Sequence, residues 1–277
     1  MLRSILVALD ATQASSQAQQ LAIDMAKRLD CQITGLAILD RAHITSPTPV
    51  GIGGMAYKQH RDQVKLEEAK SFLHRLEKGF EQSCEAIGAV WQVIEAEGVP
   101  HKLIEQESGR HDLLVIGKDT DFHFDVDPST ADTVQRLLRD NPRPLLVCPE
   151  QASGEGTILA TYDGSVRSSR ALHMLVLLGH AHGRPVHVLS VAADRQTAEQ
   201  QARYPMELFA KHGYQATPHG IGSRADPAEI VLTEAEALGA TLIVMGASGH
   251  SALHEFFLGS TSQRVLNSCP CVLFVHH

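Results

Sequence analysis

Short apolar runs alternate along the chain with longer segments in which apolar residues recur every three or four positions. The first pattern predicts buried strands and the second predicts amphipathic helices. The strand-like runs include residues 32–39, 90–95, 113–117, 185–191 and 215–219. The helical segments include residues 59–87, 100–108 and 197–212, with a further helix opening at an Asp-Pro pair at 226–227. Strands of this kind, separated by helices, are typical of a parallel sheet with helices on both faces.

The two halves of the chain repeat the same features in the same order. The first strand of each half ends at an aspartate, Asp10 and Asp163, and a later buried strand ends at a glycine, Gly117 and Gly246. Each half then closes with an apolar strand that follows a proline. The recurrence of these features in one order indicates an internal repeat.

Residues 149–156, between the copies, are poor in large apolar side chains and bounded by Pro and Gly, which indicates a linker. We therefore expect two domains, 1–150 and 157–277, in an α/β fold class. Each is expected to be a doubly wound domain with an open, mainly parallel five-stranded sheet and helices on both faces. The copies are expected to pack together through their last strands, as a monomer with an internal pseudo-dimer or as a homodimer.

Composition excludes several classes of protein. Of the 277 residues, 43% are hydrophobic. The chain has 24 Lys and Arg against 32 Asp and Glu, a net charge of −8, which disfavours binding to nucleic acid through bulk charge. No apolar run approaches the roughly 18 residues that span a membrane, and the N-terminus does not resemble a signal peptide. Five scattered cysteines favour reduced thiols in a cytoplasmic protein. Cys269-Pro270-Cys271 is one residue shorter than a Cys-x-x-Cys site and is interpreted as core or surface.

The strongest chemical signal is Gly246-Ala247-Ser248-Gly249, followed after nine residues by Gly259-Ser260-Thr261. Gly246 and Gly249 allow positive φ and close approach of the main chain to an anion. The second triplet precedes a predicted helix, whose first N–H groups lack intrahelical partners and favour phosphate. Alternatively, each glycine merely separates strand, loop and helix, and Ser260 or Thr261 serves as an N-cap.

These motifs, G-x2-G-x9-G-[ST], the strand ending in aspartate and the closing Pro-x-Val-Leu-x-Val-like strand, resemble the universal stress protein family. The resemblance covers both halves, as in tandem members. It implies that the glycine pattern holds phosphates and ribose, that the aspartate approaches adenine, and that a main-chain group at the end of strand two contacts the base edge. The positions implied are Asp163, Val191, Gly246, Gly249, Gly259, Ser260 and Thr261.

The first half departs from this pattern. No second glycine follows Gly117 in the acidic segment 118–127, and Ala131-Asp132-Thr133 aligns with Gly259-Ser260-Thr261. Asp132 would place a carboxylate where an anion should bind, among other acidic residues that repel it. We expect this half to be structural, without nucleotide.

Catalytic signals are weak. His250 follows Gly249, where an imidazole could contact phosphate or equally face solvent. Asp163 could simply form a turn, because Asp10 shows the same pattern. No Walker A loop, nucleophile elbow or kinase signature occurs, and no metal-ligand pattern is formed by the 16 histidines.

The leading hypothesis is a tandem universal stress protein that binds ATP, ADP or AMP, with or without Mg²⁺, in its second domain and acts as a non-enzymatic stress-response regulator with an unknown protein partner. The alternatives are a slow ATP hydrolase using His250 or Asp163, and a nucleotide-free module that contacts protein, lipid or metal. Gly259→Glu is expected to abolish nucleotide binding without unfolding the chain.

Overall fold

The computed structural model describes residues 1–46, 55–120, 122, 132–152, 155–247 and 260–277. Within these residues the strands are β1 (Ser4–Leu9), β2 (Gln32–Leu39), β3 (Trp91–Glu97), β4 (Leu113–Gly117), β5 (Leu145–Cys148), β6 (Thr157–Thr161), β7 (Val186–Ala192), β8 (Ala216–Gly222), β9 (Ala240–Gly246) and β10 (Val272–His276). The helices are α1 (Gln13–Leu29), α2 (Arg41–Ile44), α3 (Met55–Ile87), α4 (Pro100–Ser108), α5 (Asp132–Asp140), α6 (Val166–Leu178), α7 (Arg195–Arg203), α8 (Met206–Lys211), α9 (Pro227–Ala237) and α10 (Ser260–Ser268).

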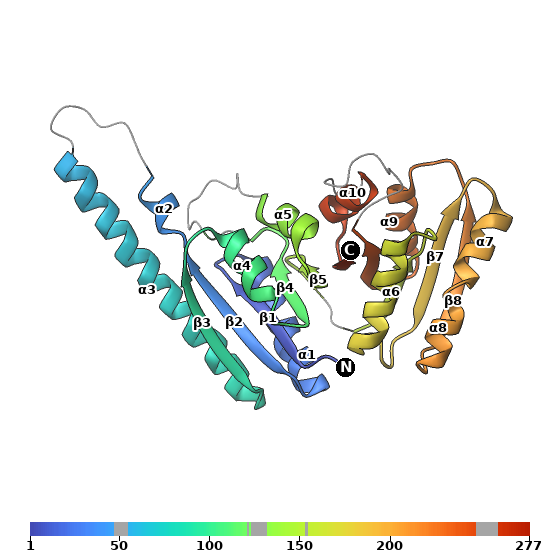
Figure 1. Cartoon of the computed structure of the whole chain (residues 1–277), viewed down its shortest axis with the longest axis horizontal. Coiled ribbons are helices and arrows are strands. Elements are labelled where there is room, and N and C mark those ends of the chain that lie inside the picture. Colours follow the sequence, from blue (N-terminus) through green and yellow to red (C-terminus); the bar gives the residue numbers. More distant parts are fainter. Residues whose placement is uncertain (47–54, 121, 123–131, 153–154, 248–259) are drawn as a thin grey trace.

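The strands form one continuous sheet in the order β3-β2-β1-β4-β5-β10-β9-β6-β7-β8. Strands β1–β5 make up the first half and β6–β10 the second, and each half has the same internal order. All neighbours are parallel except β5 and β10, which pair antiparallel with Phe274 beside Leu146 and so join the halves. Figure 1 shows the two halves next to each other. The two predicted five-stranded sheets therefore merge into one through their last strands. The prediction that the copies pack through these strands agrees with this arrangement.

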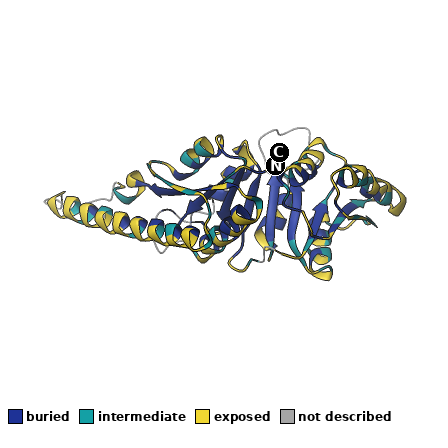
Figure 2. Cartoon of the chain, turned by 90° about the horizontal axis from the view of Figure 1, so that it is seen from below, coloured by how far each residue is buried: buried dark blue, intermediate teal, exposed yellow. Residues whose placement is uncertain are grey.

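Helices cover both faces of this sheet. Alternate residues of each strand enter opposite apolar clusters, as Val7 and Leu9 do on one face and Leu6 and Ala8 on the other. Helices α1, α3, α6 and α8 contribute to the first cluster, and α4, α5, α9 and α10 to the second. The inner strands are accordingly buried between helices whose outer surfaces are exposed, whereas the edge strands β3 and β8 are partly exposed (Figure 2). The predicted doubly wound α/β class is confirmed.

The predicted helix over residues 197–212 is wrong as a single element. The chain forms α7 and α8 instead, separated by Tyr204 and Pro205. Proline lacks the N–H that a continuous helix needs, and its ring clashes with the carbonyl of the preceding turn. The apolar periodicity continues across the break because Ala202 of α7 and Phe209 of α8 are both buried.

Gly117 illustrates how tightly the strand ends pack on the helices. A Cβ placed there would lie 2.5 Å from the Ser15 nitrogen and 2.8 Å from the Ala14 carbonyl carbon, both of them backbone atoms of α1. Gly117→Ala is expected to lower the free energy of unfolding by about 1–3 kcal/mol, the usual cost of overpacking. Urea denaturation of the full chain measures this change.

Gly79 in α3 is the matched control, because a Cβ at that helical position meets nothing within 4 Å. Gly79→Ala is expected to raise the free energy of unfolding by about 0.5–1 kcal/mol through helix propensity. Equal effects of the two substitutions, in sign and size, would contradict the packing explanation for Gly117.

Candidate functional site

The second half contains a topological switch point between β6 and β9. These strands are neighbours in the sheet, yet β6 leads into α6 on one face and β9 leads toward α10 on the other. The connections part in opposite directions at the carboxyl ends of the two strands, and open α/β sheets bind their ligands at such switch points. Asp163 follows β6 and Gly246 ends β9, so both lie at this edge.

Asp163 is held by the turn that starts α6. Its Oδ1 accepts a hydrogen bond from the Ser165 N–H at 3.0 Å, and the Ser165 Oγ in turn accepts from the Ser168 N–H at 3.1 Å. Ser165 is the N-cap of α6. The turn interpretation of Asp163 is therefore correct, and this turn also keeps the half-buried carboxylate at the strand end.

The structure requires glycine at position 246 for a different physical reason from the one expected. It is the last residue of β9 and is not among the glycines with positive φ. A Cβ at this position would lie 2.8 Å from the Arg167 carbonyl carbon and from the Ser168 nitrogen. Close packing of β9 against the first turn of α6 requires this glycine, and the positive-φ argument is wrong for it.

Helix α10 begins at Ser260, two residues before the expected start. Ser260 is exposed and Thr261 is half-buried, while the Ser262 Oγ donates a hydrogen bond to the Gly246 carbonyl oxygen at 3.2 Å. This bond ties the first turn of α10 to the end of β9. The first N–H groups of the helix, which have no intrahelical partner, thus lie at the same sheet edge, with the positive end of the helix dipole.

Val191 is the residue before the last one of β7. It is half-buried and pairs in register with Ile221 of β8. It packs against the apolar cluster that includes α9 and α10. Gly249, His250 and Gly259 lie outside the described residues. The structure therefore places Asp163, Val191, Gly246, Ser260 and Thr261 along one sheet edge and leaves the role of each in binding as a prediction.

At the corresponding edge of the first half, the aspartate is buried and hydrogen-bonded to a neighbouring side chain. Asp10 is only 1% exposed, and its Oδ1 accepts from the Thr12 N–H at 2.7 Å, as Asp163 does from its own turn. Its Oδ2 accepts a second hydrogen bond, at 2.6 Å, from the Thr120 hydroxyl. This buried pair uses the carboxylate internally, a difference from the half-buried Asp163.

Thr120 stands three positions after the strand-ending glycine of the first half, where the second half has Gly249. The first half therefore has a threonine where the second half has a glycine, and the threonine hydroxyl bonds to Asp10. Phe122, two residues further on, is 1% exposed and belongs to the apolar cluster beneath α4 and α5. The sequence shows the missing glycine, whereas these contacts join residues far apart in the chain.

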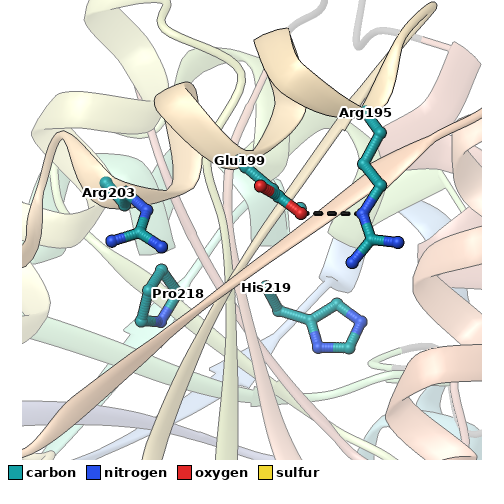
Figure 3. A pocket seen from close by; sticks show the side chains of 6 residues that line it. Arg195, Glu199, Arg203, Pro218 and His219 are labelled. Atoms are coloured by element: carbon teal, nitrogen blue, oxygen red, sulfur yellow. Dashed lines mark hydrogen bonds and ion pairs between the residues drawn. The ribbon is translucent and has the colours of Figure 1, made fainter.

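A separate cavity of about 310 Å³ lies between α7 and the edge strand β8. Its lining residues are Arg195, Glu199, Arg203, Pro218, His219 and Gly220. Arg195 donates to Glu199 at 2.7 Å, which neutralises part of the local positive charge (Figure 3). The cavity lies at the outer edge of the sheet, where β6 and β7 separate β8 from β9, and none of the predicted site residues lines it.

Two further properties of the described residues bear on function. No helix among them is long and apolar enough to cross a membrane. Within the same residues, no cluster of three or more His, Cys, Asp or Glu side chains is arranged to hold a metal ion.

The fold and the switch-point edge define a tandem, doubly wound α/β protein with a candidate ligand site in one copy. A model of the universal stress protein family matches residues 1–147 and 156–277. The chain belongs to this family, with one copy in each half.

One relative matches the whole tandem chain and another matches a single copy. A universal stress protein from Synechocystis is 26% identical over 289 residues, covering 99% of this chain and 100% of that protein. A shorter relative from Thermus aquaticus is 32% identical over 129 residues, covering 42% of this chain and 93% of its own. The crystal structure of a universal stress protein from Archaeoglobus fulgidus superposes with a TM-score of 0.68 at 21% identity, covering 98% of this chain and 97% of that one, which supports the fold.

Proposed function

We propose that the second half of this chain binds an adenine nucleotide, ATP, ADP or AMP, at the edge formed by β6, β7, β9 and α10, and that the protein acts as a non-enzymatic stress-response regulator. The first half serves as a scaffold without nucleotide. A universal stress protein from Arabidopsis thaliana has been solved with AMP bound. The proposal for this chain rests on its own residues.

The difference between the two copies is the observation that carries the proposal. Both halves have the strand, the aspartate, the turn and the close-packed glycine. In the first half, however, the aspartate is buried against Thr120 and Phe122 fills the adjoining core. This shared scaffold, with Asp10 buried in the first half and Asp163 half-buried in the second, supports a ligand site in the second half.

The start of α10 supports a phosphate group as the part of the ligand nearest to it. Ser260 and Thr261 occupy the first turn, and no acidic residue does. Ser262 holds this turn against the end of β9. Unpaired main-chain N–H groups and two hydroxyls at a helix N-terminus suit an anion, whereas an aspartate, Asp132, begins α5 in the first half.

Nucleotide binding would stabilise the native chain by mass action. It would also order the surface that protein partners contact. Regulation by this route requires the bound nucleotide to persist without turnover. We therefore expect ATP recovered after prolonged incubation with the protein to be intact, as measured by chromatography.

The matched pair Asp163→Asn and Asp10→Asn tests the assignment of the site to the second half. Asparagine keeps the oxygen that each turn needs but removes the negative charge. Asp163→Asn is expected to weaken ATP binding by about tenfold or more, the worth of one charge-assisted hydrogen bond. Asp10→Asn is expected to leave affinity unchanged. Isothermal titration calorimetry with ATP and AMP measures both.

The absence of saturable ATP and AMP binding to the unaltered chain would overturn the proposed function. Equal weakening by both substitutions would overturn the assignment to the second half. The melting temperatures of both variants confirm that any loss of binding comes from the site and not from unfolding.

A further inference from the structure

Two cysteine thiols meet at the junction between α10 and β10. Cys269 and Cys271 flank Pro270, and their Sγ atoms lie 3.3 Å apart. The Cys269 Sγ also contacts the Cys271 carbonyl oxygen at 3.2 Å. Cys269 is 4% exposed, whereas Cys271 is half-buried, so a small molecule approaching from solvent meets the pair from the Cys271 side.

The environment divides the two thiols into different chemical roles. The hydrogen bond with Cys271 and the nearby Lys118 ammonium lower the pKa of Cys269. The same hydrogen bond, burial and the charge on Cys269 raise the pKa of Cys271. Of the two, Cys269 therefore loses its proton more readily to give a thiolate, the nucleophilic form of cysteine, with Cys271 as the neighbouring thiol.

Lys118 reaches this pair from the first half of the chain. It follows β4, and its Nζ donates a hydrogen bond to the Asn267 carbonyl oxygen of α10 at 2.7 Å. The antiparallel pairing of β5 with β10 brings the carboxyl edge of the first half to this end of α10. The thiol pair consequently lies where the two halves meet.

We propose that Cys269 and Cys271 form a reversible dithiol–disulfide pair that is oxidised by hydrogen peroxide. The Cys269 thiolate attacks one peroxide oxygen, the O–O bond breaks, and the leaving hydroxide takes a proton to give water and a sulfenic acid. The Cys271 sulfur then attacks the Cys269 sulfur, forming the S–S bond as the sulfenic hydroxyl leaves as a second water. The Cys271 thiol proton leaves with that hydroxyl, so the protein loses two protons and two electrons, and one peroxide becomes two waters.

The geometry suits closure by this short step. A disulfide has an S–S length of about 2.05 Å, so the two sulfurs need to approach by roughly 1.2 Å from their observed contact. Only Pro270, which is exposed, separates the two residues. A disulfide in so small a ring is strained and easily reduced, which is the behaviour of regulatory disulfides.

The other three cysteines provide an internal comparison. Cys31, Cys84 and Cys148 are buried in the apolar cluster on the opposite face of the sheet. Burial raises the pKa of Cys31 and of Cys84 to about 11 and raises that of Cys148 further. They are expected to stay reduced under conditions that oxidise the pair.

The experiment uses the reduced full chain, treated with hydrogen peroxide and then analysed by intact mass and tryptic mapping. Cleavage after Arg264 releases residues 265–277, which carry both cysteines of the pair and none of the others. The expected product is the loss of two hydrogens from this peptide, reversed by dithiothreitol. A peptide that stays reduced while Cys31, Cys84 or Cys148 reacts would overturn the proposal, as would an intermolecular disulfide.

Single substitutions test the two roles. In Cys271→Ser the sulfenic acid cannot be resolved, so dimedone should label Cys269. In Cys269→Ser no dimedone label should appear on Cys271. Labelling with the opposite preference would overturn the assignment of the nucleophile, and the disulfide in the unaltered chain is measured without any variant. No nucleotide enters these measurements, so their outcome is independent of the proposed function.

Discussion

Ser260→Asp is expected to lower the affinity of the chain for ATP by at least about 100-fold while leaving its melting temperature unchanged or slightly raised. Ser260 is exposed and begins α10. A carboxylate there would face the phosphates that we place at the helix N-terminus, and two like charges about 4 Å apart near a surface repel by about 4 kcal/mol. The same carboxylate interacts favourably with the helix dipole, so stability should not fall.

Ser268→Asp is the matched control for this substitution. It adds the same charge to an exposed position of the same helix, at the opposite end. Affinity for ATP should remain within about twofold of the unaltered chain, because roughly 12 Å of helix separates the two positions. Equal affinities for Ser260→Asp and the unaltered chain, by calorimetry, would contradict phosphate binding at α10.

The fold was largely predictable from local patterns. Strands β2 and β4 and helix α4 have the predicted bounds because each combines a clear period with a clear boundary signal, such as Pro100 at the start of α4. Other elements were missed for physical reasons. Helix α2 has no buried residue and therefore no apolar pattern. The break at Pro205 was hidden because both of its flanking helices present apolar residues to the sheet.

The candidate site was predictable only as far as the repeat reveals it. Asp163 and Gly246 stand out because Asp10 and Gly117 recur at matching positions. In the first half, the buried carboxylate of Asp10 accepts a hydrogen bond from Thr120, which is 110 residues away. No local sequence pattern predicts this bond. The requirement for glycine at position 246 is also long-range. It arises because β9 packs on the first turn of α6, which precedes Gly246 by some 80 residues in the sequence.

Acidification from pH 7 to pH 4 is expected to cost the folded chain about 3 kcal/mol through His180 alone. This residue follows the end of α6 and is 2% exposed. Its Nε2 lies 3.4 Å from the Arg184 Nη1, and its Nδ1 lies 3.5 Å from the Arg28 Nη2 of α1. A neutral imidazole has one acceptor nitrogen for these donors, whereas a protonated imidazole has none and adds a third positive charge.

Burial, with Arg184 and Arg28, lowers the pKa of His180 to about 3. The unfolded chain, in which the pKa of histidine is about 6.5, therefore binds more protons than the folded chain between these values. The contribution of the neutral histidine to stability is fully present above pH 6.5 and falls by about 1.4 kcal/mol for each unit below it. Because Arg28 and Arg184 come from different halves, this loss acts at their junction.

Urea denaturation at pH 7 and pH 4 measures the effect in three proteins. His180→Gln cannot titrate, so its loss of stability on acidification should be about 3 kcal/mol smaller than that of the unaltered chain. His182→Gln, at an exposed position two residues away, should retain the full loss. His276, whose burial lowers its pKa to about 4, contributes to the acid loss in all three proteins and cancels in the comparison. The same loss of stability in His180→Gln as in the unaltered chain would show that a different group governs acid unfolding at this junction.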